Sequence, residues 1–279
     1  MHPIPGISFA DILMSLRSEV VDLTAANVAA NSLALARMGD AGLIAANAVV
    51  KSGAHRVAKP VKLKAPIDGV QKVICVGMNY VEHCTEQNMP VPTEPVIFNK
   101  FPSTICGTGD PLPKDPETEE LDYEVELAVV IGKTVPRRTT EADADNYILG
   151  YTVAHDVSAR DWQLKKNGGQ WLIGKTFDNY APIGPAIVTR AGIDPNNIGV
   201  RTRVNGRTLQ DGHTKEFVFT PQFCVAWISR FVTLEPGDLI FTGTPSGVGC
   251  FRDPPIWLQK GDVVECEIDG IGTITNPVV

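Results

Sequence analysis

The pattern of hydrophobic and polar positions changes once along this chain. Its first part carries the start and stop signals of helices: residues 8–11 form a capping-box pattern, and Thr24 precedes an Ala/Leu-rich stretch that Gly39 closes. A junction marked by two prolines follows. We therefore expect a small helical N-terminal region over residues 1–66.

Beyond this junction, short β-type runs alternate with Gly, Pro and Asn. Asn205-Gly206 and Asp269-Gly270 have the composition of hairpin turns, and Thr220-Pro221 opens a helix that runs to about Phe231. Strands far outnumber helices and no regular βαβ alternation occurs, so residues 67–279 are expected to form one β-rich α+β domain, a sandwich or a roll. The predicted strands are residues 73–77, 95–100, 103–107, 121–131, 148–155, 182–188, 200–204, 238–243, 262–268 and 271–275.

Composition narrows the classes of function. The 279 residues carry 25 basic and 32 acidic side chains, a net charge of −7, so no basic field exists to recruit nucleic acid or an anionic membrane. No apolar run is long enough to span a bilayer. Six dispersed cysteines without a C-x-x-C pair, and an N-terminus unlike a secretory signal, indicate a reducing compartment inside the cell, either the cytoplasm or the mitochondrial matrix.

Two glutamates mark the most informative predicted strand, residues 121–131. Glu124 and Glu126 alternate with Val125 and Leu127, so both carboxylates project from one face while apolar side chains occupy the other. Two like charges so close repel by roughly 4 kcal/mol at an effective dielectric constant of about 20. Such a pair needs a proton, an arginine or a metal, unless it lies on an exposed edge where water solvates both acids.

A third acid stands at the end of another predicted strand. Asp156 follows residues 148–155 and precedes residues 158–161, a capping-box pattern that predicts the start of a helix. Together with Glu124 and Glu126 it makes an oxygen-only ligand set. Such a set favours Mg²⁺ or Mn²⁺ over Zn²⁺, with Ca²⁺ as a substitute, and leaves other positions to water or substrate oxygens.

His83 and Glu86 are spaced to share one face of a helix. A carboxylate held against an imidazole fixes the tautomer and raises the basicity, as a general base requires. A surface ion pair without function has the same spacing. Gly77 and Asn79, just upstream, predict a turn that would let the segment move as a lid.

The Gly-rich loop at residues 242–249 follows a predicted strand. Its backbone N–H groups, that of Gly243 among them, can hold a carboxylate or a developing oxyanion. A turn without function would have the same Gly/Pro composition. The loop is therefore a candidate substrate-binding element.

Residues 169–176 match the phosphate-loop pattern G-x-x-x-x-G-K-[ST] letter for letter. No apolar strand is predicted before them and no long helix after them, and the bulky residues inside the pattern do not suit a loop that wraps phosphates. We reject a nucleotide-phosphate site here. Lys175 stays a candidate as a cation beside an anionic substrate.

Taken together and in order, five motifs resemble the fumarylacetoacetate hydrolase family. They lie within residues 70–279, about three quarters of the chain, at residues 79–86, 122–132, 155–163, 174–185 and 242–249. The resemblance implies the mixed β-sandwich roll of that family, usually as a homodimer. It also implies that Glu124, Glu126 and Asp156 bind Mg²⁺ or Mn²⁺.

The resemblance also implies roles for other residues. His83 and Glu86 match a dyad that activates water or moves a proton. Lys175 and Gln163 match residues beside the metal and the substrate, and Thr244, next to Gly243, matches the loop that grips a substrate carboxylate. Arg160 and Asp161 match as supporting ion-pair residues.

The expected substrate is a small anionic 2-oxo acid that chelates the metal and passes through an enolate. Cleavage of a C–C bond in acylpyruvate-type substrates, with water activated by the dyad, is the leading prediction. Tautomerisation or decarboxylation of oxaloacetate would use the same site. From a different class of function, a homologue that keeps the fold and binds ligands without turnover is the alternative.

Overall fold

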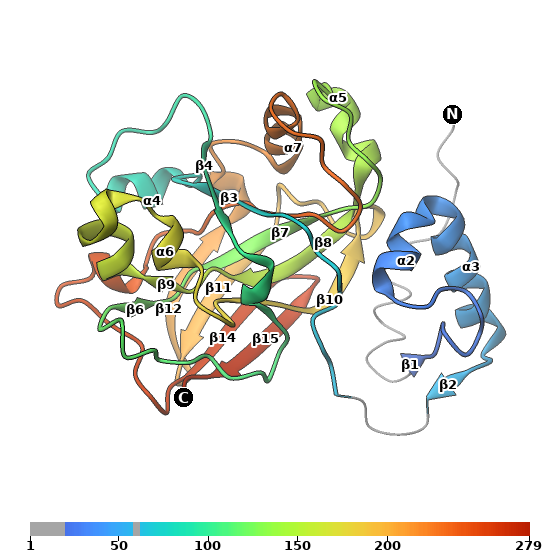
Figure 1. Cartoon of the computed structure of the whole chain (residues 1–279), viewed down its shortest axis with the longest axis horizontal. Helices are drawn as coiled ribbons and strands as arrows, with labels where there is room; N and C mark the ends of the chain where they lie inside the picture. The colour runs from blue at the N-terminus through green and yellow to red at the C-terminus, as the bar shows by residue number, and fades with distance from the viewer. Residues whose placement is uncertain (1–19, 58–61) are drawn as a thin grey trace.

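The computed structural model describes residues 20–57 and 62–279, so the helix start expected at residues 8–11 lies outside the described part. The first described residues form two helices and a two-stranded antiparallel ladder (Figure 1). These elements are β1 (Val20–Val21), α2 (Ser32–Arg37), α3 (Gly39–Ser52) and β2 (Arg56–Val57).

The helix expected directly after Thr24 begins later in the chain. The Asp22 carboxylate accepts hydrogen bonds from the N–H groups of Thr24 and Ala25, which holds this stretch in turns. Helix α2 starts after Asn31, whose side chain accepts from the Ala34 N–H.

The larger part of the chain contains a mixed seven-stranded sheet with the order β4-β3-β13-β7-β8-β10-β5. The pairs β13–β3 and β10–β5 are parallel, and the other neighbours are antiparallel. The strands are β3 (Val73–Gly77), β4 (Val96–Lys100), β5 (Ile105–Cys106), β7 (Val125–Ile131), β8 (Ile148–His155), β10 (Ala181–Thr189) and β13 (Leu239–Phe241).

The two edges of this sheet lie close together because the sheet curls. Strands β4 and β5 form opposite edges, yet only residues 101–104, including the short 3-10 turn Pro102–Thr104, separate them in sequence. Five peptide units reach at most about 18 Å, whereas the edges of a flat seven-stranded sheet would lie roughly 29 Å apart. The curl brings the end of β4 toward the end of β8, where the acidic residues stand.

A four-stranded antiparallel sheet, with the order β12-β11-β14-β15, packs against the larger one. Val129 of β7, Val200 of β11 and Ile268 of β14 belong to one buried cluster, so the two sheets share a core. Asn205-Gly206 and Asp269-Gly270 form its two hairpin turns, as predicted. Its strands are β11 (Gly199–Val204), β12 (Arg207–His213), β14 (Val263–Ile268) and β15 (Gly272–Pro277).

Most predicted strands are present, but several elements differ from the prediction. Residues 121–131 break into β6 (Leu121–Asp122) and β7, with Glu124 in the gap. Strand β12 was missed because Leu209 is its one large apolar residue, too little for an alternating pattern. The helix expected to start at Ser158 does not: β9 (Ser158–Ala159) pairs with β6, the Ser158 hydroxyl donates to the Asp156 carbonyl, and a π-helical turn follows at Asp161–Lys165.

The β-rich part has few helices, and they stand at the ends of strands. Thr220 caps α7 by accepting from the Phe223 N–H, as the Thr-Pro signal predicts. The helices are α4 (Val81–Glu86), α5 (Glu141–Ala144), α6 (Leu172–Lys175) and α7 (Pro221–Ser229). The α+β, β-rich sandwich roll with a small helical N-terminal region is thereby confirmed.

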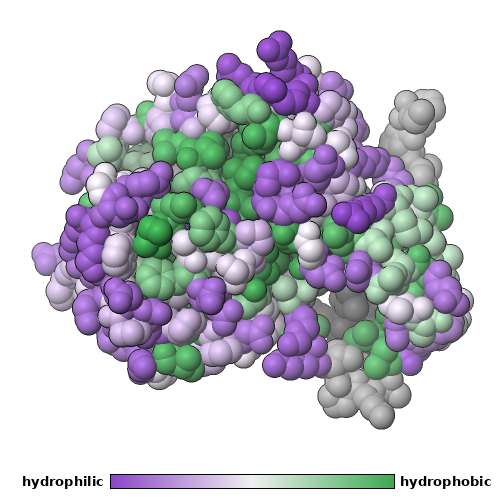
Figure 2. All heavy atoms as spheres, viewed as in Figure 1, coloured by the Kyte–Doolittle hydropathy of each residue, from purple (hydrophilic) through white to green (hydrophobic). Residues whose placement is uncertain are grey.

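Hydrophilic residues cover most of the face in Figure 2, and hydrophobic residues gather in its upper middle, where Figure 1 places β4 and α7. Ile97, Phe101, Phe231 and Val232 are exposed there and line a groove beside the edge strand. Within residues 20–57 and 62–279, the structure contains no helix with the length and hydrophobicity needed to cross a membrane.

Candidate active site

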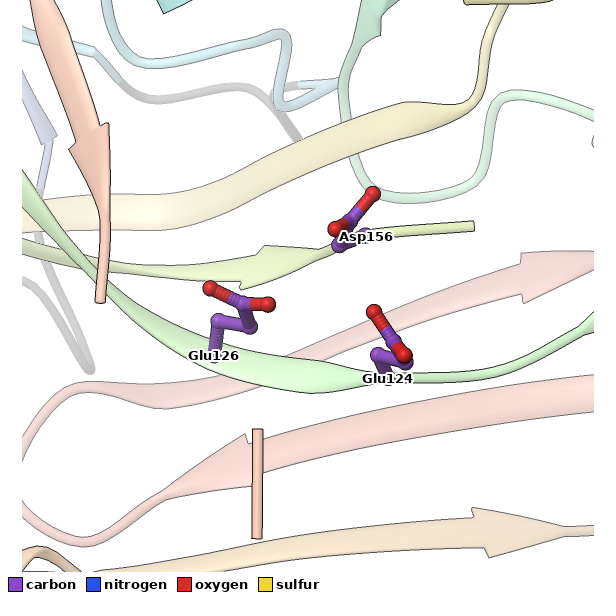
Figure 3. A group of neighbouring side chains, drawn as sticks. All are labelled: Glu124, Glu126 and Asp156. Carbon is purple, nitrogen blue, oxygen red and sulfur yellow. The ribbon is translucent and has the colours of Figure 1, made fainter. Parts of the chain in front are cut away.

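Glu124, Glu126 and Asp156 meet where strand β7 begins and strand β8 ends (Figure 3). The register pairs Val125 with His155 and Glu126 with Ala154, and the Asp156 N–H donates to the Glu124 carbonyl. One oxygen of each carboxylate lies within 4.8 Å of the others. The side chains are 4%, 2% and 0% exposed, which excludes the alternative of solvated acids on an open edge.

Three buried cations neutralise part of this acidic cluster. Lys175 Nζ lies 2.6 Å from Glu124 Oε2 and 2.7 Å from Asp156 Oδ2. Arg160 donates to the other Glu124 oxygen at 2.6 Å. Lys100 Nζ lies 2.5 Å from Asp156 Oδ1. Glu126, in contrast, accepts only the Gly243 N–H, at 2.6 Å, among the described residues.

These contacts shift the pKa values of Glu124 and Glu126 in opposite directions. Burial alone would raise the pKa of Glu124, but Arg160 and Lys175 outweigh it and hold this pKa well below its usual value. The pKa of Glu126 is raised by burial and by the charges of Asp156 and Glu124. Within residues 20–57 and 62–279, Glu126 is therefore a buried carboxylate that forms no ion pair, although the more distant Lys175 charge acts on it.

The three carboxylates fit a hard divalent cation. They supply oxygen donors only, they converge from the ends of two adjacent strands, and no cation in the described part of the chain forms an ion pair with Glu126. Glu124 and Glu126 line a pocket that also contains His83, Gln163 and Thr244, so ligand positions remain for substrate oxygens, while Asp156 is buried behind them. A dication here would be held by Glu124, Glu126 and Asp156.

His83 and Glu86 lie together on α4, and His83 lines this pocket. His83 Nδ1 is 2.6 Å from Glu86 Oε1, and Glu86 Oε2 accepts the Gly247 N–H at 2.9 Å. His83 is 6% exposed, which excludes the alternative of a solvated surface pair. The carboxylate fixes the imidazole so that its other nitrogen is available to a substrate.

The start of α4 is tied to the core. Asn79 is fully buried; its amide donates to the carbonyls of Phe219 and Thr242 at 3.0 and 2.7 Å, and its side-chain oxygen accepts the Phe219 N–H at 2.8 Å. A lid movement of α4, as expected from its turn residues, would have to break these hydrogen bonds of Asn79 or hinge at a point after Asn79.

The loop at residues 242–249 uses its N–H groups differently from the expectation. Gly243 donates to Glu126, Gly247 to Glu86 and Gly249 to Asp122, so these amides hold the protein's own carboxylates. The Thr244 hydroxyl accepts from Gln210 at 2.7 Å and lines the pocket. The loop therefore joins the acidic cluster to the histidine dyad.

Arg160 links the metal-site candidates to this loop. Its guanidinium donates to Asp122 at 2.8 Å, to Gln163 at 2.8 Å and to Glu124 at 2.6 Å. Asp122, itself wholly buried, also accepts the N–H groups of Gly249 and Cys250. Asp161 lies outside this network and accepts from the Thr118 hydroxyl at 2.6 Å.

The phosphate-loop match at residues 169–176 does not form a phosphate site. The segment combines a 3-10 turn with the four-residue helix α6, and its lysine is engaged by two carboxylates. Trp171 packs edge-on against Phe98, with ring centroids 5.3 Å apart, and Phe98 supports the Lys175 ammonium at 4.9 Å. These aromatic rings form the apolar wall of the pocket.

Two residues of the site were not singled out from the sequence. Lys100 ends β4, and nothing near it in sequence signals a partner on β8. His155 is buried, its Nε2 has no partner among the described residues, and burial followed by the charge of Lys100 lowers its pKa to about 3. Neither residue lies in a local pattern that signals its burial or its partner.

The fold and the buried carboxylates define a β-sandwich roll with a candidate metal centre. The family model described as fumarylacetoacetate (FAA) hydrolase C-terminal matches residues 72–279. This chain therefore belongs to the fumarylacetoacetate hydrolase family, and it is an enzyme of that family.

Curated relatives extend the similarity. Oxaloacetate tautomerase fahd2, mitochondrial, of Xenopus laevis is 55% identical over 244 residues, which cover 87% of this chain and 76% of the relative. Oxaloacetate tautomerase FAHD2A, mitochondrial, of Homo sapiens is 55% identical over 216 residues, 77% of this chain and 68% of the relative. Fumarylacetoacetate hydrolase domain-containing protein 2 of Pongo abelii is 54% identical over 216 residues, with the same coverage of both chains.

Solved structures agree with the fold. Fumarylacetoacetate hydrolase from psychrophilic Exiguobacterium antarcticum matches with a TM-score of 0.74 and 43% identity over 80% of each chain. The 2-hydroxyhepta-2,4-diene-1,7-dioate isomerase from Mycobacterium marinum matches with a TM-score of 0.68 and 44% identity, covering 78% of this chain and 77% of that one.

Proposed function

We propose that this enzyme acts on small 2-oxo acids with the help of Mg²⁺ or Mn²⁺, and that it tautomerises oxaloacetate. The observation that carries the metal dependence is Glu126, a buried carboxylate beside two others with no counter-ion of its own. Ca²⁺ is a possible substitute, because the donors are oxygens only.

Each group at the site has a distinct task in this proposal. A bound dication supplies stabilisation of the negative charge that develops on the 2-oxo oxygen. Lys175 adds a fixed positive charge beside the same position, and Gln163 and Thr244 offer hydrogen bonds to the substrate. His83, held by Glu86, accepts or returns a proton through its free ring nitrogen.

Of the three candidate reactions, tautomerisation is the simplest, because it needs no second reactant and breaks no C–C bond. One proton leaves the carbon next to the 2-oxo group and one is delivered to the oxygen, so the enol isomer forms with no other reactant. In this proposal His83, which lines the pocket, carries out both transfers. The names of the relatives at 54–55% identity favour this reaction over the C–C bond hydrolysis that led among the sequence predictions.

Hydrolysis of acylpyruvates and decarboxylation of oxaloacetate would begin from the same enolate-forming site. The two reactions differ in their second step, since water attack cleaves a C–C bond whereas loss of CO₂ requires no water. We retain both as second candidates, since the dyad of His83 and Glu86 could equally activate water.

A substrate panel tests these proposals. Purified enzyme with Mg²⁺ or Mn²⁺ is assayed with oxaloacetate, acetylpyruvate and fumarylpyruvate, while enol absorbance, CO₂ release and C–C cleavage are followed separately. We expect fast keto–enol exchange of oxaloacetate that EDTA abolishes. Exchange that is unchanged by EDTA would contradict metal dependence, and cleavage of acylpyruvates without exchange would favour hydrolysis.

We further propose that the enzyme works in the mitochondrial matrix. The curated relatives from Xenopus laevis and Homo sapiens carry the designation mitochondrial, and the described cysteines are all free thiols, as a reducing compartment requires. Fractionation of cells that express the tagged full-length protein tests this location. The homodimer that the family resemblance implies stays a prediction for multi-angle light scattering.

A further inference from the structure

Lys100 is a buried cation that contacts a candidate metal ligand but does not line the active-site pocket. Its side chain is 0% exposed, and its Nζ donates to Asp156 Oδ1 at 2.5 Å and to the Val157 carbonyl at 3.0 Å. It lines the groove beside β4, whereas Lys175 lines the active-site pocket. Lys100 can therefore act on Asp156 without touching a substrate.

Both oxygens of Asp156 are already paired with ammonium groups. Lys100 engages Oδ1 and Lys175 engages Oδ2. A carboxylate so neutralised attracts a dication less than a free one does, because each ammonium repels the incoming charge. The site therefore combines ligands for a dication with two lysines that compete with the dication for Asp156.

The charges of the buried cluster give a simple count. Four carboxylates, those of Asp122, Glu124, Glu126 and Asp156, face the three cations Lys100, Arg160 and Lys175, so −4 + 3 = −1. A dication changes the total to +1. A chelating dianion such as oxaloacetate or oxalate then brings it back to −1, so metal and anion together restore the charge of the cluster without ligands.

We propose that Lys100 is a positioning residue and internal counter-ion of Asp156 that keeps the dication affinity low until a chelating anion binds, so that metal and 2-oxo acid bind cooperatively. This inference rests on the proposed function, because it requires the carboxylates to hold a dication. Loss of the Lys100 charge should strengthen metal binding in the absence of anion and should weaken the coupling.

Mn²⁺ binding, measured by the EPR signal of free Mn²⁺, tests this inference. The dissociation constant is determined with and without oxalate, with correction for the Mn²⁺–oxalate complex in solution, for the wild type and for Lys100→Met and Lys100→Arg. Lys133→Met is the matched control, because Lys133 pairs with Asp40 on the exposed surface.

We expect oxalate to tighten Mn²⁺ binding to the wild type at least tenfold. Lys100→Met should bind Mn²⁺ at least tenfold more tightly than the wild type without oxalate and should lose most of the oxalate effect, while Lys100→Arg and Lys133→Met behave like the wild type. A merely structural role predicts the reverse, weaker Mn²⁺ binding by a distorted site.

Equal or weaker Mn²⁺ binding by Lys100→Met, with native circular dichroism, would overturn the inference. If that variant does not fold, the wild type still decides: Mn²⁺ binding that oxalate does not change overturns the inference and leaves the proposed function intact. A wild type that binds no Mn²⁺ with or without oxalate overturns both.

Discussion

Glu86 bridges His83 and Gly247: one carboxylate oxygen lies 2.6 Å from His83 Nδ1, and the other accepts the Gly247 N–H at 2.9 Å. The residue that orients the imidazole is thus anchored in the Gly-rich loop. The same loop anchors Glu126 through the Gly243 N–H. Proton transfer and metal binding are therefore positioned by one backbone segment.

Glu86→Gln should lower kcat by about 10²-fold or more while Mn²⁺ binding stays within threefold of the wild type, because the orienting charge is lost but no candidate ligand is altered. Glu82→Gln on the same helix is the matched control, since Glu82 contacts only the Ser246 hydroxyl among the described residues. Steady-state kinetics and EPR measure both quantities. An equal loss of turnover and Mn²⁺ affinity would contradict the role assigned to the dyad.

Glu126→Gln should abolish metal-dependent turnover and yet stabilise the metal-free protein. Burial and two neighbouring carboxylates raise the pKa of Glu126, so removal of its charge relieves an unfavourable interaction of roughly 1–2 kcal/mol. Urea unfolding in EDTA measures the stability, and an Mn²⁺ titration measures the affinity. Full Mn²⁺ affinity in this variant would remove Glu126 from the ligand set.

Asp122→Asn should destabilise the fold by about 3–5 kcal/mol, because it leaves the buried Arg160 without one of its two carboxylate partners. The same change also disturbs the acceptor of the Gly249 and Cys250 N–H groups. Glu120→Gln is the control, since its partner Lys165 is 64% exposed and their ion pair should be worth less than about 1 kcal/mol. Similar losses of unfolding free energy in the two variants would show that burial does not make the Asp122–Arg160 ion pair more important than a surface pair.

Gly77→Ala should cost about 1–3 kcal/mol, because the new Cβ would lie 2.7 Å from the Trp171 ring. Trp171→Phe removes the ring atoms that clash, so the double variant should recover at least half of the loss. Urea unfolding of both single variants and of the double variant gives the coupling energy. If the unfolding free-energy changes of the two single variants simply add in the double variant, the proposed clash between residue 77 and the Trp171 ring would be contradicted.

Asp161→Asn tests a pH dependence outside the acidic cluster. Burial would raise the pKa of Asp161, but the hydrogen bonds from Thr118 and Lys166 lower it below the ordinary value of 3.8. A lowered pKa stabilises the fold above the unfolded-state value and loses that effect as the pH falls through the folded-state value.

The variant should therefore cost about 1–3 kcal/mol at neutral pH, and its difference from the wild type should shrink below a pH of about 3.8. Urea unfolding across this range measures the difference. A difference that stays constant down to a pH of about 2.5 would assign the cost to packing rather than to the charge.

Local patterns predicted much of the fold and the central acids. The alternation around Glu124 and Glu126 placed both carboxylates on one side of β7, because side chains of a strand alternate strictly. The turn pairs at Asn205 and Asp269 and the cap at Thr220 were likewise local signals, and the structure contains all three.

Local patterns failed where a partner lies far away in sequence. Residues 158–161 have the pattern of a capping box, but Ser158 pairs with Asp122 on another strand instead. The amides of the Gly-rich loop looked free for a substrate, yet Gly243 and Gly249 donate to carboxylates more than 100 positions earlier in the chain.

The sequence by itself determined which residues form strands and which acids share a face, since these depend on backbone geometry over a few positions. Only the tertiary structure decided how the acids are neutralised. The curl of the seven-stranded sheet carries Lys100 from the edge strand to Asp156, 56 positions away, and the charge balance of the site follows from that long-range closure.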